Sequence, residues 1–168
     1  KDFIFQTRSR SNKPIRILSI GRAHWKKGYQ YALQTCALLK QKGYEFGYTI
    51  VGVNKDEQLL FLKHTLQLNE KVKFVPRCSM EEVKSLVYDY DVLLLTSVEE
   101  GVANVVLEAM ALGLPVICTD CGGMSEVIKN KENGFLVPIR NPEAMAEAIH
   151  EFTQLSDTEV EGMVEKAR

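Results

Sequence analysis

The stretch Asp91–Thr119, DVLLLTSVEEGVANVVLEAMALGLPVICT, predicts a strand, a helix and a second strand in close succession. Residues 91–96 are continuously apolar after the aspartate, as expected of a strand that is covered on both faces. We expect Asn104 to cap the helix, which then runs to Leu112, because an asparagine side chain accepts hydrogen bonds from the first helical turn. A second buried strand follows at residues 114–119. This unit favours a buried parallel sheet.

The rest of the chain repeats this alternation of strands and helices. Strands are expected at residues 15–20, 46–53, 72–75 and 134–137, and helices at residues 29–42, 56–68, 80–88, 124–128 and 142–155, with a last helix opening at Ser156. Repeated units of this length imply parallel strands joined by right-handed crossovers. The predicted fold class is α/β, a doubly wound, Rossmann-like parallel sheet with helices on both faces. In such sheets ligands bind beyond the carboxyl ends of the strands.

Composition limits the class of partner. With 168 residues, of which 45% are hydrophobic, the chain suits one compact domain with a real core. Its 21 basic residues nearly balance its 22 acidic ones, which argues against nucleic acid or an anionic membrane as the main partner. The sequence contains no run of 18 apolar residues, so we expect no transmembrane segment.

Four cysteines, Cys36, Cys78, Cys118 and Cys121, are scattered along the chain and form no dense disulfide framework. This usage favours a reducing compartment. Cys118 and Cys121 form a C-x-x-C pair, but a structural zinc site needs a second pair at similar spacing. We therefore expect ordinary free thiols.

Two acidic residues flank the start of the central helix. Glu108 stands among apolar residues, where a carboxylate needs hydrogen-bond partners or loses its charge. Glu100 lies in the loop that enters the helix, and we expect both acids to face one crevice. Each acid has an alternative interpretation. Glu100 could be placed there only because the positive end of the helix dipole stabilises its charge, and Glu108 could reach solvent at the helix edge. Likewise, Gly122 and Gly123 form either a plain turn or a place where a ligand approaches the backbone.

A loop between the first strand and its helix carries Gly21-Arg22-x4-Lys27-Gly28. A guanidinium and an ammonium near a helix start, with glycines that allow close approach, suit a phosphate or diphosphate. The loop is neither G-x-x-x-x-G-K nor G-x-G-x-x-G, so neither nucleotide hydrolysis nor dinucleotide binding is indicated. Taken alone, the two cations could also be solvated surface charges.

Four motifs occur in a fixed order: Gly21-Arg22-x4-Lys27-Gly28, Glu100-Gly101-x6-Glu108-Ala-Met-Ala-x-Gly113-x-Pro115-Val, Thr119-x2-Gly122-Gly123-x2-Glu126-Val-Ile and Asn133-Gly134-Phe-Leu-Val-Pro. Together they resemble the C-terminal half of a retaining glycosyltransferase of family four, with the GT-B fold. The resemblance runs from about Pro14 to Phe152. The family has two Rossmann-like domains, of which the C-terminal one holds a nucleotide-sugar donor. The resemblance implies an interdomain linker at residues 1–13, a nucleotide-sugar-binding C-terminal domain at residues 14–168, and an absent N-terminal acceptor domain.

The resemblance also implies roles for individual residues. Arg22 and Lys27 match the diphosphate-binding pair, Glu108 the acid that accepts hydrogen bonds from the ribose, and Glu100 the acid that contacts the transferred sugar. The base is expected near residues 76–78, and the diphosphate at the N-terminus of the helix that follows Glu100. The expected catalytic residues are Arg22, Lys27 and Glu100. The expected donor contacts are Arg22, Lys27, Arg77, Cys78, Glu100, Gly101, Val102, Ala103, Asn104, Val105 and Glu108.

The implied activity is retaining transfer of a hexose from a nucleotide-diphosphate sugar, such as a UDP- or GDP-hexose, in glycan, polysaccharide or glycolipid synthesis. The acceptor, a sugar or lipid-linked glycan, would bind the missing half, so this chain alone is expected to be inactive. The resemblance implies no cofactor and no metal. Asp89-Tyr90-Asp91 has the D-x-D form of metal-dependent glycosyltransferases, but it lies at the wrong end of the sheet. A cytoplasmic location is expected, with peripheral contact at the cytoplasmic face of a membrane left open.

Two alternatives remain for the function as a whole. One is a nucleotide-sugar epimerase of the same two-domain fold, and the other is a non-catalytic regulatory or interaction subunit on this scaffold. The sequence also departs from the family pattern, because Gly101-Val102-Ala103 stands where Gly-Phe-Gly is usual. This departure leaves the identity of the donor sugar open.

Overall fold

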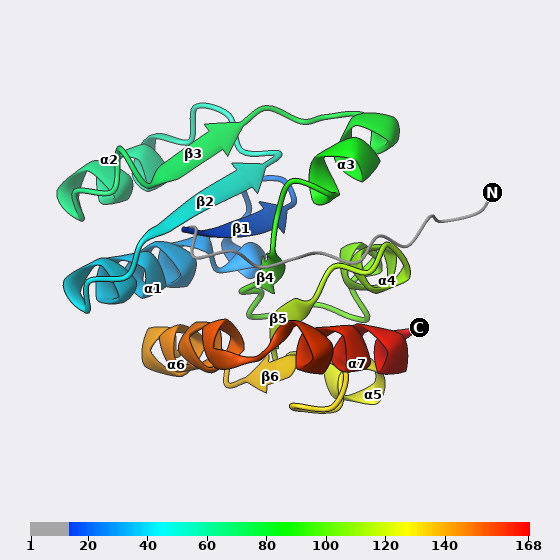
Figure 1. The fold of residues 1–168 in the computed structure, drawn as a ribbon. Coiled ribbons are helices and arrows are strands. Elements are labelled where there is room, and N and C mark those ends of the chain that lie inside the picture. The colour runs from blue at the N-terminus through cyan, green and yellow to red at the C-terminus, as the bar shows by residue number, and fades with distance from the viewer. Residues whose placement is uncertain (1–13) are drawn as a thin grey trace.

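A computed structural model describes residues 14–168, which form a six-stranded parallel sheet between two layers of helices (Figure 1). The strands are β1 (Ile15–Ile20), β2 (Phe46–Val51), β3 (Val72–Val75), β4 (Val92–Leu95), β5 (Val116–Thr119) and β6 (Phe135–Val137). The helices are η1 (Trp25–Lys27), α1 (Tyr29–Gln41), α2 (Glu57–Thr65), α3 (Met80–Val87), α4 (Asn104–Ala111), α5 (Met124–Val127), α6 (Pro142–Gln154) and α7 (Asp157–Ala167). The linker expected at residues 1–13 lies outside the described part of the chain.

The sheet separates two hydrophobic cores. Side chains alternate along a strand, so Ile17 of β1 points to the face covered by α1 and α6, where it joins the cluster that contains Leu33 and Phe152. Leu18 points to the opposite face and joins the cluster that contains Val106 of α4. Both faces of the central strands are therefore buried, which explains their continuous apolar runs. The doubly wound α/β prediction is confirmed.

The strand order is β3-β2-β1-β4-β5-β6, with all pairings parallel. The chain winds outward in one direction from β1 to β3 and then crosses back to β4, which pairs with β1 through Ile17–Val92 and Leu18–Leu93. This reversal places the loops that follow β1 and β4 side by side. In open α/β sheets the crevice at such a reversal is the usual ligand site.

The capping prediction at α4 is wrong by one residue. Ala103 is the N-cap, with extended φ and ψ of −74° and 116°, and its carbonyl accepts the Val106 N–H. Asn104 is already the first helical residue, so its side chain is not in the position from which a cap bonds the first turn. Among the described residues, the start of α4 therefore has no side-chain cap.

Other boundaries also differ from the prediction, and two of them have a clear cause. Asp56, expected as the first residue of a helix, is instead the N-cap of α2 and accepts the Leu59 N–H at 2.9 Å. The second strand ends at Val51, two residues before the predicted end, because Gly52 turns the chain with a φ of 99°. None of the helices in residues 14–168 is long and apolar enough to cross a membrane.

Candidate functional site

The loop after β1 is fixed to the loop after β4. The Thr96 hydroxyl donates to the Lys27 carbonyl at 2.8 Å, and the Val98 N–H donates to the Lys26 carbonyl at 2.7 Å. Gly28 has a φ of 63°, and a Cβ atom there would lie 2.2 Å from the Thr96 carbonyl oxygen. Only glycine fits where the two backbones cross. The second glycine of the G-R-x4-K-G motif is thus explained by loop packing.

This junction brings Lys27 onto Glu100. The Lys27 ammonium lies 2.6 Å from Glu100 Oε2, and the Ser97 hydroxyl donates to the same oxygen at 3.1 Å. Tyr29, the first residue of α1, is buried, and its hydroxyl donates to the Gly21 carbonyl at 2.9 Å. Burial, and secondarily the charge of Glu100, raise the pKa of Tyr29, so its hydroxyl stays protonated. Lys27, Ser97 and Glu100 are called the Glu100 cluster below.

The end of β5 supports the Glu100 cluster from below. The Thr119 hydroxyl, which is fully buried, donates to the Ser97 carbonyl at 2.5 Å. Gly122 has a φ of 57°, and a Cβ atom there would lie 1.7 Å from the Glu100 carbonyl oxygen. In this structure the backbone of Glu100 is therefore what approaches Gly122 and requires a glycine there.

Beside this cluster, on the β2 and β3 side, lies an open cleft with a volume of about 540 Å³. Arg22 follows β1, Arg77 and Cys78 follow β3, and Glu108 comes from α4; all four line the cleft. Its volume falls within the range of roughly 300–1,000 Å³ that is typical of ligand sites. Arg22, Arg77, Cys78 and Glu108 are called the Glu108 cleft below.

The charged side chains of the Glu108 cleft have no partner among the described residues. Within residues 14–168, Arg22, Arg77 and Glu108 make no ion pair and no side-chain hydrogen bond. Glu108 is only half-buried, so solvent explains how the apolar helix α4 tolerates its carboxylate. This outcome agrees with the alternative in which Glu108 reaches the helix edge, and it leaves both carboxylate oxygens open to a ligand.

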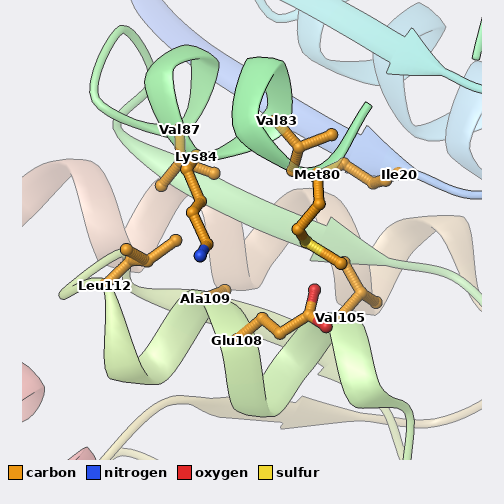
Figure 2. A pocket seen from close by; sticks show the side chains of 9 residues that line it. All are labelled: Ile20, Met80, Val83, Lys84, Val87, Val105, Glu108, Ala109 and Leu112. Carbon is orange, nitrogen blue, oxygen red and sulfur yellow. The ribbon is translucent and has the colours of Figure 1, made fainter. Parts of the chain in front are cut away.

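An apolar groove of about 200 Å³ between α3 and α4 continues the Glu108 cleft. Figure 2 shows Val105 and Glu108 of α4 facing Met80 and Val83 of α3. The Glu108 carboxylate therefore stands where the polar cleft meets an apolar wall. Such a boundary suits a ligand with hydroxyl groups next to a flat apolar part.

The start of α4 offers free backbone donors. The Asn104 and Val105 N–H groups have no hydrogen-bond partner within residues 14–168, and no acidic residue lies in the first turn. Ala103 differs, because it is buried and its N–H points at the Met124 sulfur at 3.5 Å. Free N–H groups and the positive end of the helix dipole favour an anion here.

The predicted site residues thus fall into two groups that adjoin at Val105. Lys27 and Glu100 belong to the cluster, whereas Arg22, Arg77, Cys78, Val105 and Glu108 line the cleft. Gly101 and Val102 are exposed in the loop between them. Sequence reasoning assigned no role to Ser97 or Thr119, although each is a hydroxyl residue at or just after the end of an apolar run that reaches the carboxyl edge of the sheet.

Glu99, beside Glu100, forms an ion pair with Lys26 at the surface. Side-chain exposures of 59% for Glu99 and 40% for Lys26 agree with the expectation of a solvated charge. The pair closes the outer side of the loop junction, next to the exposed Trp25. Exposed pairs of this kind contribute only about 0–1 kcal/mol.

The D-x-D triplet lies at the amino edge of the sheet, away from both groups. Asp91 Oδ2 accepts the Arg16 backbone N–H at 2.7 Å, and Asp91 Oδ1 lies 3.3 Å from the Arg16 guanidinium. These contacts join the starts of β1 and β4. Within residues 14–168 no cluster of three potential metal ligands occurs.

The four cysteines are free thiols, as predicted. Burial raises the pKa of Cys118 to about 12 and also raises the pKa of Cys121. At neutral pH both therefore stay protonated, and a protonated thiol is a poor nucleophile and metal ligand. Their role here is to pack the end of β5.

Among curated proteins, the chain is similar to WcaL of Escherichia coli (strain K12), a glycosyltransferase provisionally assigned to colanic acid biosynthesis. The two are 35% identical over 162 residues, which is 92% of this chain. The match covers 40% of WcaL, so the chain spans less than half the length of this relative.

Solved structures share the fold, and two of them follow. The C-terminal domain of a glycosyl transferase group 1 family protein (LpcC) from Francisella tularensis superposes with a TM-score of 0.79 at 22% identity, covering 92% of this chain and 84% of that one. Anabaena Alr3699/HepE, in complex with UDP-glucose, gives a TM-score of 0.79 at 24% identity, covering 92% of this chain and 44% of HepE. The family model for glycosyl transferases group 1 matches residues 1–168. The chain therefore belongs to the glycosyl transferases group 1 family, and its fold is that of one half of a GT-B protein.

Proposed function

We propose that this domain binds a nucleotide-diphosphate hexose for a retaining glycosyltransferase that works without a metal. One observation carries the proposal. The Glu108 cleft is lined by Arg22, Arg77 and Glu108, whose side chains have no partner within residues 14–168. Val105 also lines the cleft, and its N–H is one of two at the start of α4 that have no partner in the same range. Three cationic side chains, counting Lys27, outnumber the two carboxylates, which suits a dianionic diphosphate.

The diphosphate would lie over the start of α4, between Arg22 and Lys27. There the Asn104 and Val105 N–H groups donate to phosphate oxygens, and the helix dipole favours their charge. Negative charge on the leaving diphosphate grows as the glycosidic bond breaks, so donors fixed at that position stabilise the transition state more than the ground state. Removing one such donor typically costs about 3–4 kcal/mol of that stabilisation.

The two acids recognise hydroxyl groups. Glu108, with free oxygens at the edge of the apolar groove, accepts hydrogen bonds from the ribose, while the base lies toward Arg77 and Cys78. Glu100 accepts a hydrogen bond from the transferred sugar, close to Lys27. Neither acid acts as a covalent nucleophile in this proposal, because their side chains serve to orient the donor.

The acceptor would bind a second domain across the cleft, so this chain alone would hold the donor but transfer little sugar. The likeness to WcaL, named for colanic acid biosynthesis, favours an acceptor in polysaccharide synthesis. The complex of HepE with UDP-glucose makes a uridine donor the first one to test. Free thiols at all four cysteines agree with a cytoplasmic, reducing environment.

The proposal is tested by product analysis with the full-length enzyme, UDP-glucose or GDP-mannose, and an exopolysaccharide-type oligosaccharide acceptor. A new glycosidic bond with the anomeric configuration of the donor supports it. A free epimerised sugar would instead identify an epimerase. Activity that survives Glu100→Ala unchanged would favour a non-catalytic role for this domain.

A further inference from the structure

Both protein donors that reach the Glu100 carboxylate bind the same oxygen. Lys27 lies 2.6 Å from Oε2, and the Ser97 hydroxyl donates to Oε2 at 3.1 Å. Within residues 14–168, Glu100 Oε1 accepts no hydrogen bond. The carboxylate is therefore turned so that one oxygen is held by the protein and the other is left for a ligand.

Ser97 is built into the site more firmly than a surface hydroxyl. Its side chain is fully buried, at 0% exposure, and its carbonyl accepts the Thr119 hydroxyl at 2.5 Å. Thr119 is itself at 0% exposure, at the end of β5. The Glu100 backbone in turn rests directly on Gly122, where no Cβ atom fits. The position of the Ser97 hydroxyl is thus determined by the central strands β4 and β5.

We propose that Ser97 is a positioning residue, which orients the Glu100 carboxylate so that Oε1 accepts a hydroxyl of the transferred sugar. This inference rests on the proposed function. The last torsion of a glutamate side chain is broad and roughly two-fold, so Lys27 alone would hold the charge but not the plane of the carboxylate. A second donor on Oε2 fixes that plane. Thr119 acts one step further away, by holding the Ser97 backbone.

The consequence is a split between two parts of the donor. Within residues 14–168 the Ser97 side chain hydrogen-bonds to Glu100 and not to Arg22 or to the start of α4, so its removal should leave the diphosphate and ribose contacts unchanged. A nucleotide sugar gains affinity over the nucleoside diphosphate through the contact of its sugar with Glu100. This gain in affinity should fall when Ser97 is replaced. A purely structural role for Ser97 would lower both affinities together.

The test is titration calorimetry of the wild-type protein and Ser97→Ala with two ligand pairs, UDP with UDP-glucose and GDP with GDP-mannose. For the pair that the wild type binds, we expect the nucleoside diphosphate Kd to stay within about twofold. The Kd of the nucleoside diphosphate divided by the Kd of the nucleotide sugar should fall about tenfold, which corresponds to about 1.4 kcal/mol. Full-length Ser97→Ala enzyme should show a raised KM for the donor.

Thr119→Val provides a second variant in case Ser97→Ala folds poorly, and it should shift the same ratio by a smaller factor. Thr35→Val is the matched control, because Thr35 is also fully buried and donates to a backbone carbonyl, that of Tyr31, away from the site. Thr35→Val should lower thermal stability without changing the ratio.

Two results would overturn the inference in distinguishable ways. An unchanged ratio in both Ser97→Ala and Thr119→Val, with intact UDP or GDP binding, rejects the positioning role and leaves the proposed function standing. If the wild-type protein binds neither pair, the proposed function itself is contradicted, and this inference falls with it.

Discussion

The Glu100 cluster and the Glu108 cleft lie next to each other, yet their side chains are organised in opposite ways. In the cluster, Lys27 and Ser97 both bind Glu100, and the Ser97 carbonyl accepts the hydroxyl of Thr119 at the end of β5. In the cleft, Arg22, Arg77 and Glu108 bind no other group within residues 14–168. The difference suggests that the sugar end of the site is pre-organised, whereas the nucleotide end is completed by its ligand. Mutations should therefore separate stability from activity.

Lys27→Ala is expected to have the largest effect, because Lys27 serves both the fold and the ligand. Loss of the ammonium leaves the half-buried Glu100 with one donor fewer, which should lower the free energy of unfolding by about 1–3 kcal/mol. Loss of a phosphate donor should lower kcat about 100–1,000-fold. Chemical denaturation and steady-state kinetics of the full-length enzyme measure the two effects.

Lys26→Ala is the matched control for this change, since Lys26 pairs with Glu99 at the surface. It should alter the free energy of unfolding by less than about 1 kcal/mol and leave kcat nearly unchanged. Equal losses in the two variants would mean that the Glu100 cluster is no more organised than the surface beside it.

Arg22→Ala should lower kcat by about 100-fold with little change in stability. Arg22 has no partner to lose within the described residues, and surface substitutions of this kind usually change the free energy of unfolding by less than about 0.5 kcal/mol. Thermal unfolding without ligand, together with kinetics, tests the separation. A large drop in melting temperature would contradict this separation and show that Arg22 also stabilises the fold.

Glu108→Ala should abolish discrimination between ribose and deoxyribose, because alanine has no side-chain acceptor. A hydrogen bond to a charged group contributes about 1.5–3 kcal/mol, so the wild-type protein should bind UDP about 10–100-fold more tightly than 2′-deoxy-UDP, or GDP than 2′-deoxy-GDP. The variant should bind both alike, with unchanged stability. Calorimetry with the four ligands measures this, and discrimination that persists in the variant would place the ribose elsewhere.

The smallest expected effect concerns the wall of the Glu108 cleft, where Glu82 closes the capping box of α3 with Ser79. The Ser79 N–H donates to Glu82 Oε2 at 2.7 Å, and hydrogen bonds from Ser79 hold the pKa of Glu82 below its usual 4.5. A carboxylate whose pKa is lowered by folding stabilises the folded protein above about pH 4.5, and this contribution is lost as the pH falls further and the carboxylate is protonated.

Glu82→Ala should therefore reduce stability slightly at pH 6, and its difference from the wild type should shrink below pH 4.5. Urea denaturation at several pH values measures this, with Glu81→Ala as the control for a neighbouring acid outside the capping box. A difference that stays constant with pH would contradict the assignment.

Much of the fold was readable from local patterns in the sequence. Continuous apolar runs identified β4 and β5, and Asn141 before Pro142 identified the start of α6, because these signals depend only on neighbours along the chain. The order of the strands, and hence the meeting of the loops after β1, β4 and β5, depends on packing between distant segments. For that reason the roles of Ser97 and Gly122 emerged only in three dimensions.

The family resemblance supplied the candidate residues but not the ion pairs and hydrogen bonds that they make within the domain. It placed Lys27 and Glu100 in separate roles, toward diphosphate and sugar, whereas the structure pairs them directly. It also treated residues 101–105 alike, although the Ala103 N–H points at the Met124 sulfur, whereas those of Asn104 and Val105 have no partner within residues 14–168. Such differences arise from side-chain packing around α4, which sequence spacing does not encode.

Titration calorimetry of the wild-type protein and Arg22→Ala with UDP, GDP and ADP, without added metal, tests the central claim most directly. The account predicts that at least one of the nucleotides binds the wild type at a single site and that Arg22→Ala weakens this binding at least about tenfold. Absence of binding to all three nucleotides, or binding that Arg22→Ala leaves unchanged, would contradict the assignment of this cleft as the donor site.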